Sequence, residues 1–125
     1  MNAFALVALG GAIGAALRHA VGLATLRAFG PGFPCGTLAV NVIGSAAMGL
    51  LIAFLARGAE DGTSLRLFVA TGLLGGFTTF STFSLDVVAM WERGEAGGAF
   101  LYIAASLALG IGGLIAGLAI GRAVL

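Results

Sequence analysis

Hydroxyl side chains are concentrated in one short segment of the chain, residues 75–84, which reads GGFTTFSTFS. Five of the seven residues in positions 78–84 carry a hydroxyl. Because a hydroxyl both donates and accepts hydrogen bonds, Ser81, Thr82 and Ser84 could replace part of the water shell of a small ion. This segment is therefore the first candidate for a polar path.

Phenylalanines alternate with these hydroxyls. Phe77, Phe80 and Phe83 recur every three residues, which predicts neighbouring rings on nearly one face of a helix. An aromatic ring has a negative face and a positive edge, so rings presented edge-on would stabilise an anion and exclude cations. The alternative is lipid-facing rings, with each hydroxyl bonded back to the carbonyl four residues earlier.

Two adjacent glycines, Gly75 and Gly76, precede the hydroxyls. Each weakens a helix by about 1 kcal/mol relative to Ala. The pair predicts a helix break, and a break inside a membrane survives only where protein or water satisfies the freed backbone groups. Freed carbonyl oxygens suit a small hard cation such as Na⁺.

A second polar stripe lies earlier in the chain, where Thr37, Asn41 and Ser45 follow one another at steps of four and share a helix face. A buried amide must find hydrogen-bond partners, so Asn41 either holds helices together or lines a wet path. The aligned hydroxyls favour the path.

Small residues form two further stripes. One runs at steps of four through Gly10, Gly14, Arg18 and Gly22, and the other at steps of three and four through Tyr102, Ser106, Gly110, Gly113, Gly117 and Gly121. Close packing of membrane helices explains the glycines. It does not explain Arg18, which either faces a cavity or extends its charge to the membrane surface.

Long apolar segments must position these residues. The chain is 60% hydrophobic and 9% charged, against about 25% charged residues in soluble domains. A helix needs roughly 20 residues to cross a bilayer, and four segments meet that length: 3–26, 35–56, 65–91 and 99–120. We predict an all-α membrane protein with a broken third helix, in which residues 1–125 form one transmembrane domain and the first span is retained.

Charge hardly selects an orientation for these spans. Short cytoplasmic loops usually carry the excess of Lys and Arg, but the two sides are nearly balanced: Arg57, Arg66 and Arg122 share one side, and Arg27 and Arg93 the other. Dual insertion is therefore expected. It would give an antiparallel homodimer with its two-fold axis in the membrane plane; a parallel dimer is the alternative.

Several partners and activities are not supported. The net charge is +1 with no basic tract, so neither nucleic acid nor a polybasic lipid-binding tail is indicated. One His and one Cys, with no cluster of acids, do not make a catalytic or metal site, so we expect no enzyme. The single Cys35 cannot form an intramolecular disulfide and is read as a small packing residue.

Three motifs resemble those of the small fluoride-channel family known as Fluc or CrcB, and the resemblance covers almost the entire chain. They are residues 10–18 (GGAIGAALR), 36–45 (GTLAVNVIGS) and 75–84. The resemblance implies an antiparallel dual-topology dimer with two pores in a bacterial plasma or inner membrane. It also implies passive export of fluoride, which protects the cell from fluoride toxicity, and a structural Na⁺ at the dimer centre.

The resemblance also implies residue roles. Phe80 and Phe83 match edge-on phenylalanines and Asn41 a pore asparagine. Ser81 and Thr82 match a polar track beside them, and Tyr102 and Ser106 match pore residues of the fourth helix. Gly75 and Thr78 match the positions whose backbone carbonyls bind Na⁺. From its stripe with Asn41 we also assign Thr37 to the anion pathway, and we expect Arg18 and Asp86 in a vestibule. Three positions depart from the pattern: Gly110 replaces a frequent Ser, Asp86 a Glu, and His19 an aromatic residue.

Two other functions remain open. A small dual-topology proton-coupled multidrug-type exporter has similar subunits, but it needs a carboxylate deep in the membrane. Asp86 is the only acid within a predicted span and lies near that span's end. A purely structural subunit is the third possibility.

Overall fold

The computed structural model describes residues 2–58, 60 and 62–125. Met1, Ala59 and Asp61 of the predicted single domain lie outside the described residues. Within the described part, every regular element is helical, as predicted, and four segments are long and apolar enough to cross a membrane: Ala3–Phe29, Cys35–Leu55, Gly62–Glu92 and Ala96–Val124.

Three of these spans are single helices: α1 (Ala3–Phe29), α2 (Cys35–Leu55) and α6 (Ala96–Val124). The third span is composite. It comprises α3 (Gly62–Leu65), the π-helical segment η1 (Arg66–Leu74), α4 (Gly75–Phe77) and, after a break, α5 (Phe80–Glu92). The predicted bounds hold to within four residues. Helical hydrogen bonding continues beyond the apolar residues, and glycines with positive φ follow helix ends at Gly30, Gly58 and Gly94.

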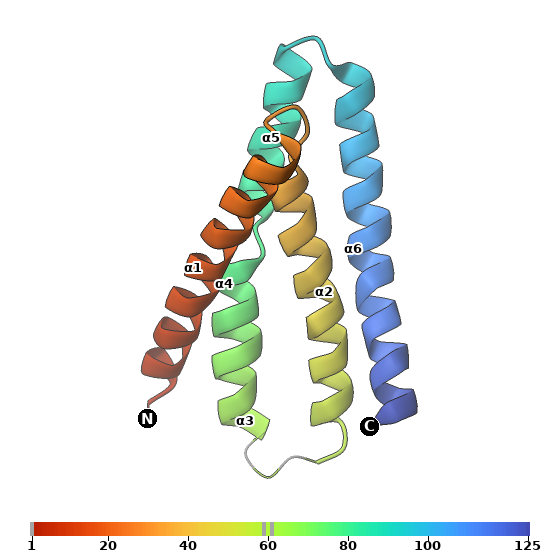
Figure 1. The fold of residues 1–125 in the computed structure, drawn as a ribbon. Coiled ribbons are helices and arrows are strands. Elements are labelled where there is room, and N and C mark those ends of the chain that lie inside the picture. The colour runs from red at the N-terminus through yellow and green to blue at the C-terminus, as the bar shows by residue number, and fades with distance from the viewer. Residues whose placement is uncertain (1, 59, 61) are drawn as a thin grey trace.

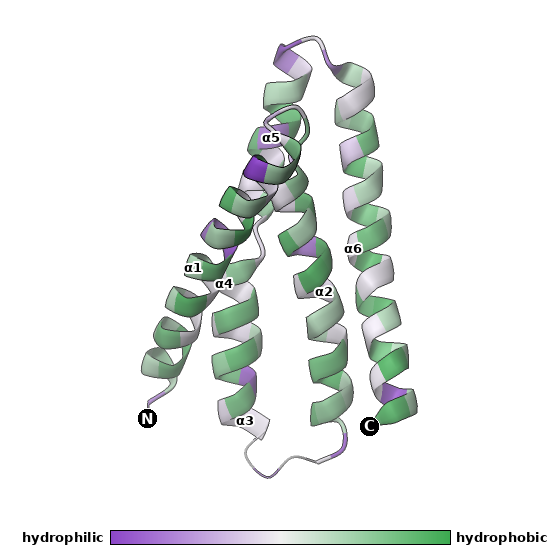
Figure 2. Cartoon of the chain, viewed as in Figure 1, coloured by the Kyte–Doolittle hydropathy of each residue, from purple (hydrophilic) through white to green (hydrophobic). Residues whose placement is uncertain are grey.

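The chain crosses the length of the bundle four times, in alternating directions (Figure 1). The two termini and the connection between α2 and α3 lie at one end of the bundle, and the other two connections lie at the opposite end. We call this opposite end the upper end. Hydrophobic residues colour most of every helix, and the strongly hydrophilic positions lie mainly near the ends (Figure 2). This distribution fits a bundle whose sides face lipid.

Glycines set the closest helix contacts. A Cβ added to Gly14 of α1 would overlap the backbone of Leu73 in η1, and one on Gly117 of α6 would overlap Ala46 of α2. The chain therefore packs as two close pairs, α1 with the lower part of the third span and α2 with α6. Gly10 and Gly14 of the first predicted stripe lie at one contact, and Gly117 and Gly121 of the second lie at the other.

The third helix is broken, but three residues later than predicted. Gly75 keeps helical dihedral angles, φ −62° and ψ −39°, whereas Thr78 and Thr79 are extended, with ψ of 159° and 119°. The glycine pair serves packing instead, since a Cβ on Gly76 would lie 2.6 Å from the Gly11 carbonyl oxygen of α1. The prediction that the chain breaks at Gly75 and Gly76 was therefore wrong in position.

The break also separates the phenylalanines. Phe77 is in α4 and is buried, whereas Phe80 begins α5 and is 78% exposed. The predicted common face is therefore limited to Phe80 and Phe83, because the extended residues between the two helices change the direction of the chain.

Candidate functional site

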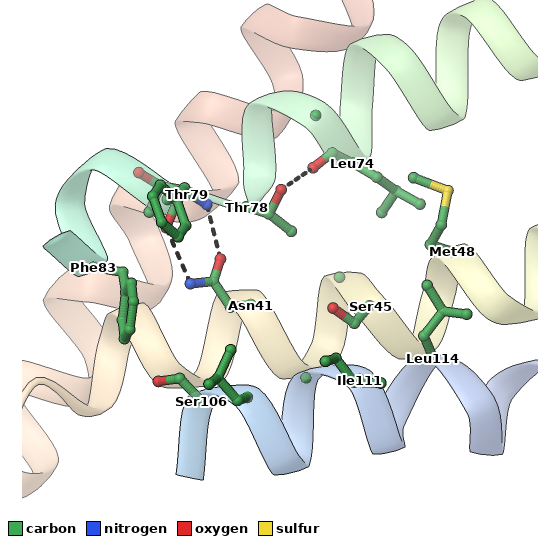
Figure 3. Close-up of a pocket in the computed structure, with 15 residues that line it drawn as sticks. Asn41, Ser45, Met48, Leu74, Thr78, Thr79, Phe83, Ser106, Ile111 and Leu114 are labelled. Atoms are coloured by element: carbon green, nitrogen blue, oxygen red, sulfur yellow. Dashed lines mark hydrogen bonds between the residues drawn. The ribbon is translucent and has the colours of Figure 1, made fainter. Parts of the chain in front are cut away.

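The break is held by the side chain of Asn41. Its Nδ2 donates to the Thr79 carbonyl oxygen (3.0 Å), and its Oδ1 accepts from the Thr79 backbone N–H (2.8 Å) (Figure 3). The carboxamide thus pairs with Thr79 as a neighbouring backbone would. An amide nitrogen carries two hydrogens, so one N–H of Asn41 remains for another acceptor.

Arg18 satisfies a second group that the break releases. Its Nε donates to the Gly76 carbonyl oxygen at 3.0 Å, and the side chain is half-buried. Within the described residues, the one salt bridge joins Arg93 to Glu95, so Arg18 has no carboxylate partner there. The guanidinium is therefore held against the break instead of extending to the membrane surface.

The hydroxyls of the segment divide into two groups. Those of Thr78 and Ser84 donate to carbonyls four residues earlier, on Leu74 and Phe80, both at 3.0 Å. The hydrogen-bonding capacity of these two hydroxyls as donors is therefore used within the third span itself. The Thr79 hydroxyl caps α5 by accepting from the Thr82 N–H at 3.2 Å, and it lies 3.5 Å from the Ser81 hydroxyl.

A groove of about 380 Å³ runs beside the break, between α2, the third span and α6. We call it the central groove. Asn41, Thr79 and Ser106 lie toward one end of it and Met48, Leu74 and Leu114 toward the other, so the groove has a polar and an apolar end (Figure 3). Its other lining residues are Gly44, Ser45, Gly75, Thr78, Phe80, Phe83, Leu107, Gly110 and Ile111.

Within the described residues, the groove contains one buried unpaired hydroxyl, on Ser106, and open space beside Gly110. The Ser106 hydroxyl oxygen is buried and has no hydrogen-bond partner among the described residues. Gly110 leaves room, since a Cβ added there would meet the Ser45 hydroxyl at 4.0 Å and no nearer atom. An unpaired buried hydroxyl is costly in a bundle core.

Aromatic rings continue from the groove toward the upper end. The ring centroids of Phe80 and Phe83 are 5.7 Å apart, those of Phe83 and Tyr102 5.1 Å, and those of Tyr102 and Phe33 5.5 Å. We call these four rings the aromatic column. Tyr102 is completely buried, and its hydroxyl donates to Oδ2 of Asp86 at 2.9 Å.

Two smaller cavities lie above the break. The arginine cavity, about 260 Å³, is lined by Arg18, His19, Thr37, Thr79 and Thr82 among others, and the outer cavity, about 240 Å³, by Thr25, Phe33, Cys35, Thr37 and Asp86 among others. Thr37 borders both of them. Polar side chains therefore extend from the break to the upper end of the bundle.

Backbone oxygens are the available ligands for a cation. Among the described residues, no three His, Cys, Asp or Glu side chains gather into a metal site. The Thr78 carbonyl oxygen accepts no hydrogen bond in the described part of the chain, and that of Gly76 is taken by Arg18; Gly75 and Thr78 both border the groove. Hard cations prefer such oxygens, but two are too few to enclose an ion.

The structure brings together many of the predicted site residues. The central groove holds Asn41, Gly75, Thr78, Phe80, Phe83 and Ser106. The cavities above it hold Arg18, Thr37, Thr82 and Asp86. Tyr102 is in the aromatic column, bordering none of these three spaces, and Ser81 is exposed beside the break.

Sequence reasoning missed Thr79 and Phe33 as site residues. Thr79 had a usable signal, because a Thr three residues before Thr82 is a typical helix N-cap. Phe33 precedes Pro34 in a connection, and nothing in the sequence placed its ring beside Tyr102.

Four apolar spans, a helix break in the third of them and a groove with polar side chains at one end define a multi-pass helical membrane protein. A family model described as "CrcB-like protein, Camphor Resistance (CrcB)" matches residues 5–118. The chain belongs to this family.

Curated relatives are similar along almost their whole length. A protein of Agrobacterium fabrum is 54% identical over 118 residues, 94% of each chain, and one of Chelativorans sp. is 55% identical over 120 residues, 96% of each. A protein of Sphingopyxis alaskensis is 53% identical over 116 residues. All three are named "Fluoride-specific ion channel FluC". This chain is therefore a bacterial multi-pass membrane protein of an ion-channel family and not an enzyme.

Proposed function

We propose that this protein is a fluoride-selective channel that lets fluoride leave the cell passively and so protects it from fluoride toxicity. The observation that carries the proposal is the central groove. There Asn41, whose amide has a spare N–H, Ser106, whose hydroxyl has no partner among the described residues, and Phe80 and Phe83 border one space. The printed names of the relatives supply the identity of the anion.

A small anion needs donors in place of its water shell. Asn41 and Ser106 supply an amide N–H and an O–H on facing helices, and the positive edges of Phe80 and Phe83 add a weaker attraction that cations do not feel. The arginine cavity above the break places the Arg18 guanidinium, without a carboxylate partner among the described residues, near Thr82. Its positive charge attracts anions to the upper mouth of the path.

One chain leaves this path incomplete. Phe80 is 78% exposed, although it lies at the middle of the third span. An antiparallel second copy, inserted in the opposite orientation, would cover this face and create two equivalent pores. The nearly balanced arginines on the two sides support dual insertion.

The same arrangement would complete the cation site. With Gly75 and Thr78 repeated in a second copy, four carbonyl oxygens would face the two-fold axis, a set suited to Na⁺. The ion would offset the oxygens' partial negative charges and join the two break regions. The Thr78 carbonyl fits this role because it accepts no hydrogen bond within the described residues.

Efflux from liposomes tests the proposed function. Purified protein should release fluoride from loaded vesicles and retain chloride, and replacing both groove phenylalanines, Phe80→Ile with Phe83→Ile, should abolish fluoride release. Phe100→Ile is the matched control, because Phe100 is 64% exposed on α6 and lies outside the groove. Equal release of chloride and fluoride, or full fluoride release by the double variant, would contradict the mechanism.

Substitution of Asp86 distinguishes a passive channel from a proton-coupled exporter. Its carboxylate accepts from the Tyr102 hydroxyl near the upper end of the third span. We expect Asp86→Asn, which keeps an acceptor oxygen, to conduct fluoride with no requirement for a proton gradient. Transport that stops in Asp86→Asn and also stops when the proton gradient is collapsed would instead support an exporter.

A further inference from the structure

Phe33 contacts the interior of the bundle although it lies outside every helix. It is in the connection between α1 and α2, and its ring packs on the buried cluster of Met90, Ala99 and Tyr102. The planes of the Phe33 and Tyr102 rings meet at 83°, with centroids 5.5 Å apart. This edge-to-face geometry is a favourable one for two aromatic rings.

The backbone around Phe33 is constrained by the start of α2. The Cys35 N–H donates to the Phe33 carbonyl oxygen at 2.8 Å, and Pro34 caps the start of α2. Proline restricts both its own φ and the conformation of the residue before it. Phe33 is thus held in place by the start of α2 without belonging to that helix.

Tyr102 is in turn held by its neighbours, among them Phe33, Phe83 and Asp86. Phe83 packs on its ring from α5, Phe33 from the connection, and Asp86 accepts from its hydroxyl. Because the hydroxyl is at the far end of a rigid ring, a small tilt of the ring moves the oxygen away from Asp86. The position of that hydroxyl therefore depends on Phe33 as well as on Phe83.

Phe33 also borders the outer cavity together with Asp86 and Thr37. Its ring stands at the edge of that space, next to a tyrosine that is completely shielded from solvent. Loss of the ring would open the cavity toward Tyr102 and admit water to its bond with Asp86.

We propose that Phe33 is a positioning residue of the anion path, whose ring holds Tyr102 so that the tyrosine hydroxyl stays bonded to Asp86 at the upper end of the aromatic column. The proposal rests on the proposed function, since it concerns the path that would carry fluoride. Phe33 itself does not contact the central groove.

Nuclear magnetic resonance can follow Tyr102 directly, because it is the single tyrosine of the chain. Protein with ¹³C at the tyrosine ring carbon that bears the hydroxyl should give one sharp signal. We expect Phe33→Leu to shift or broaden this signal and Phe29→Leu to leave it unchanged. Phe29 is the matched control, as it ends α1 near the same connection but is 71% exposed. An unchanged signal in Phe33→Leu would overturn the proposal, whatever the protein conducts.

Fluoride efflux then tests whether positioning matters for conduction. We expect Phe33→Leu to slow efflux roughly two- to tenfold, the range for loss of one aromatic pair, and Phe33→Tyr, which keeps the ring, to restore it. In a Tyr102→Phe background, which lacks the hydroxyl, Phe33→Leu should add no further loss.

The outcomes separate this proposal from the proposed function. If the unmodified protein releases no fluoride, the proposed function fails, and the resonance of Tyr102 still decides the role of Phe33. If the unmodified protein conducts but Phe33→Leu slows efflux equally with and without the Tyr102 hydroxyl, Phe33 serves only the stability of the fold and the positioning role is wrong.

Discussion

Asn41 pairs with both backbone groups of Thr79, which a hydroxyl would do poorly because its donor and acceptor share one oxygen. The sequence left open whether this amide joins helices or lines a path. In the structure it joins α2 to the break and also borders the central groove. Hydroxyl density was less informative, since Thr78 and Ser84 bond back to their own helices, and residue type alone does not show which hydroxyls do so.

We expect Asn41→Ala to lower both stability and conduction. The change leaves the Thr79 N–H and carbonyl without their partner, and each unsatisfied buried group costs about 1–3 kcal/mol. Thermal unfolding in detergent and fluoride efflux measure the two effects. Ile43→Ala is the control, since Ile43 is 54% exposed on the same helix. Efflux per folded molecule that stays at the wild-type level in Asn41→Ala would show that Asn41 only joins helices.

At the scale of elements, hydropathy predicted four spans because a helix must satisfy its own backbone in lipid. The position of the break was not predictable in the same way. Gly76 is small because α1 passes close to it, and Thr79 is extended because Asn41 and its own capping hydroxyl hold it so. Both causes lie in contacts between spans. The π-helical turns of η1 likewise have no signal in apolar periodicity.

Two glycines on α6 give a matched test of helix packing. Gly117→Ala should destabilise the protein by about 1–3 kcal/mol, because the new Cβ would overlap the Ala46 backbone of α2. Gly112→Ala should be neutral or slightly stabilising, since nothing lies within 4 Å of its added Cβ. Thermal unfolding of the two variants measures the difference. Equal melting temperatures would contradict the close approach of α2 and α6.

At the scale of the whole molecule, each side of the membrane carries a similar number of arginines, so the chain lacks the asymmetry that usually fixes orientation. This balance was readable in the sequence. How the proposed second copy would fit was not readable there, because that depends on the shape of the central groove and on which face leaves Phe80 exposed.

The single cysteine can report orientation in cells. Cys35 is partly exposed near the upper end of the bundle. If both orientations insert equally, a membrane-impermeant thiol reagent added outside should label about half of the copies, and permeabilisation should expose the rest. A Gly97→Cys variant in a Cys35→Ala background is the control for access, since Gly97 is exposed at the same end. Labelling of all copies or of none before permeabilisation would contradict dual insertion.

The hydrogen bonds of Arg18 and Asn41 at the break join early spans to a span that is synthesised later. Arg18 bonds to a residue 58 positions later and Asn41 to one 38 positions later, so the first two spans leave the ribosome before their partners exist. Until Thr79 is inserted, the nascent chain carries an arginine and an asparagine in lipid without these bonds, at a cost in free energy. Arg18 and Asn41 therefore find the partners that the structure gives them only after the third span has entered the membrane. A chain that stalls ahead of this entry keeps both polar side chains in lipid without these partners.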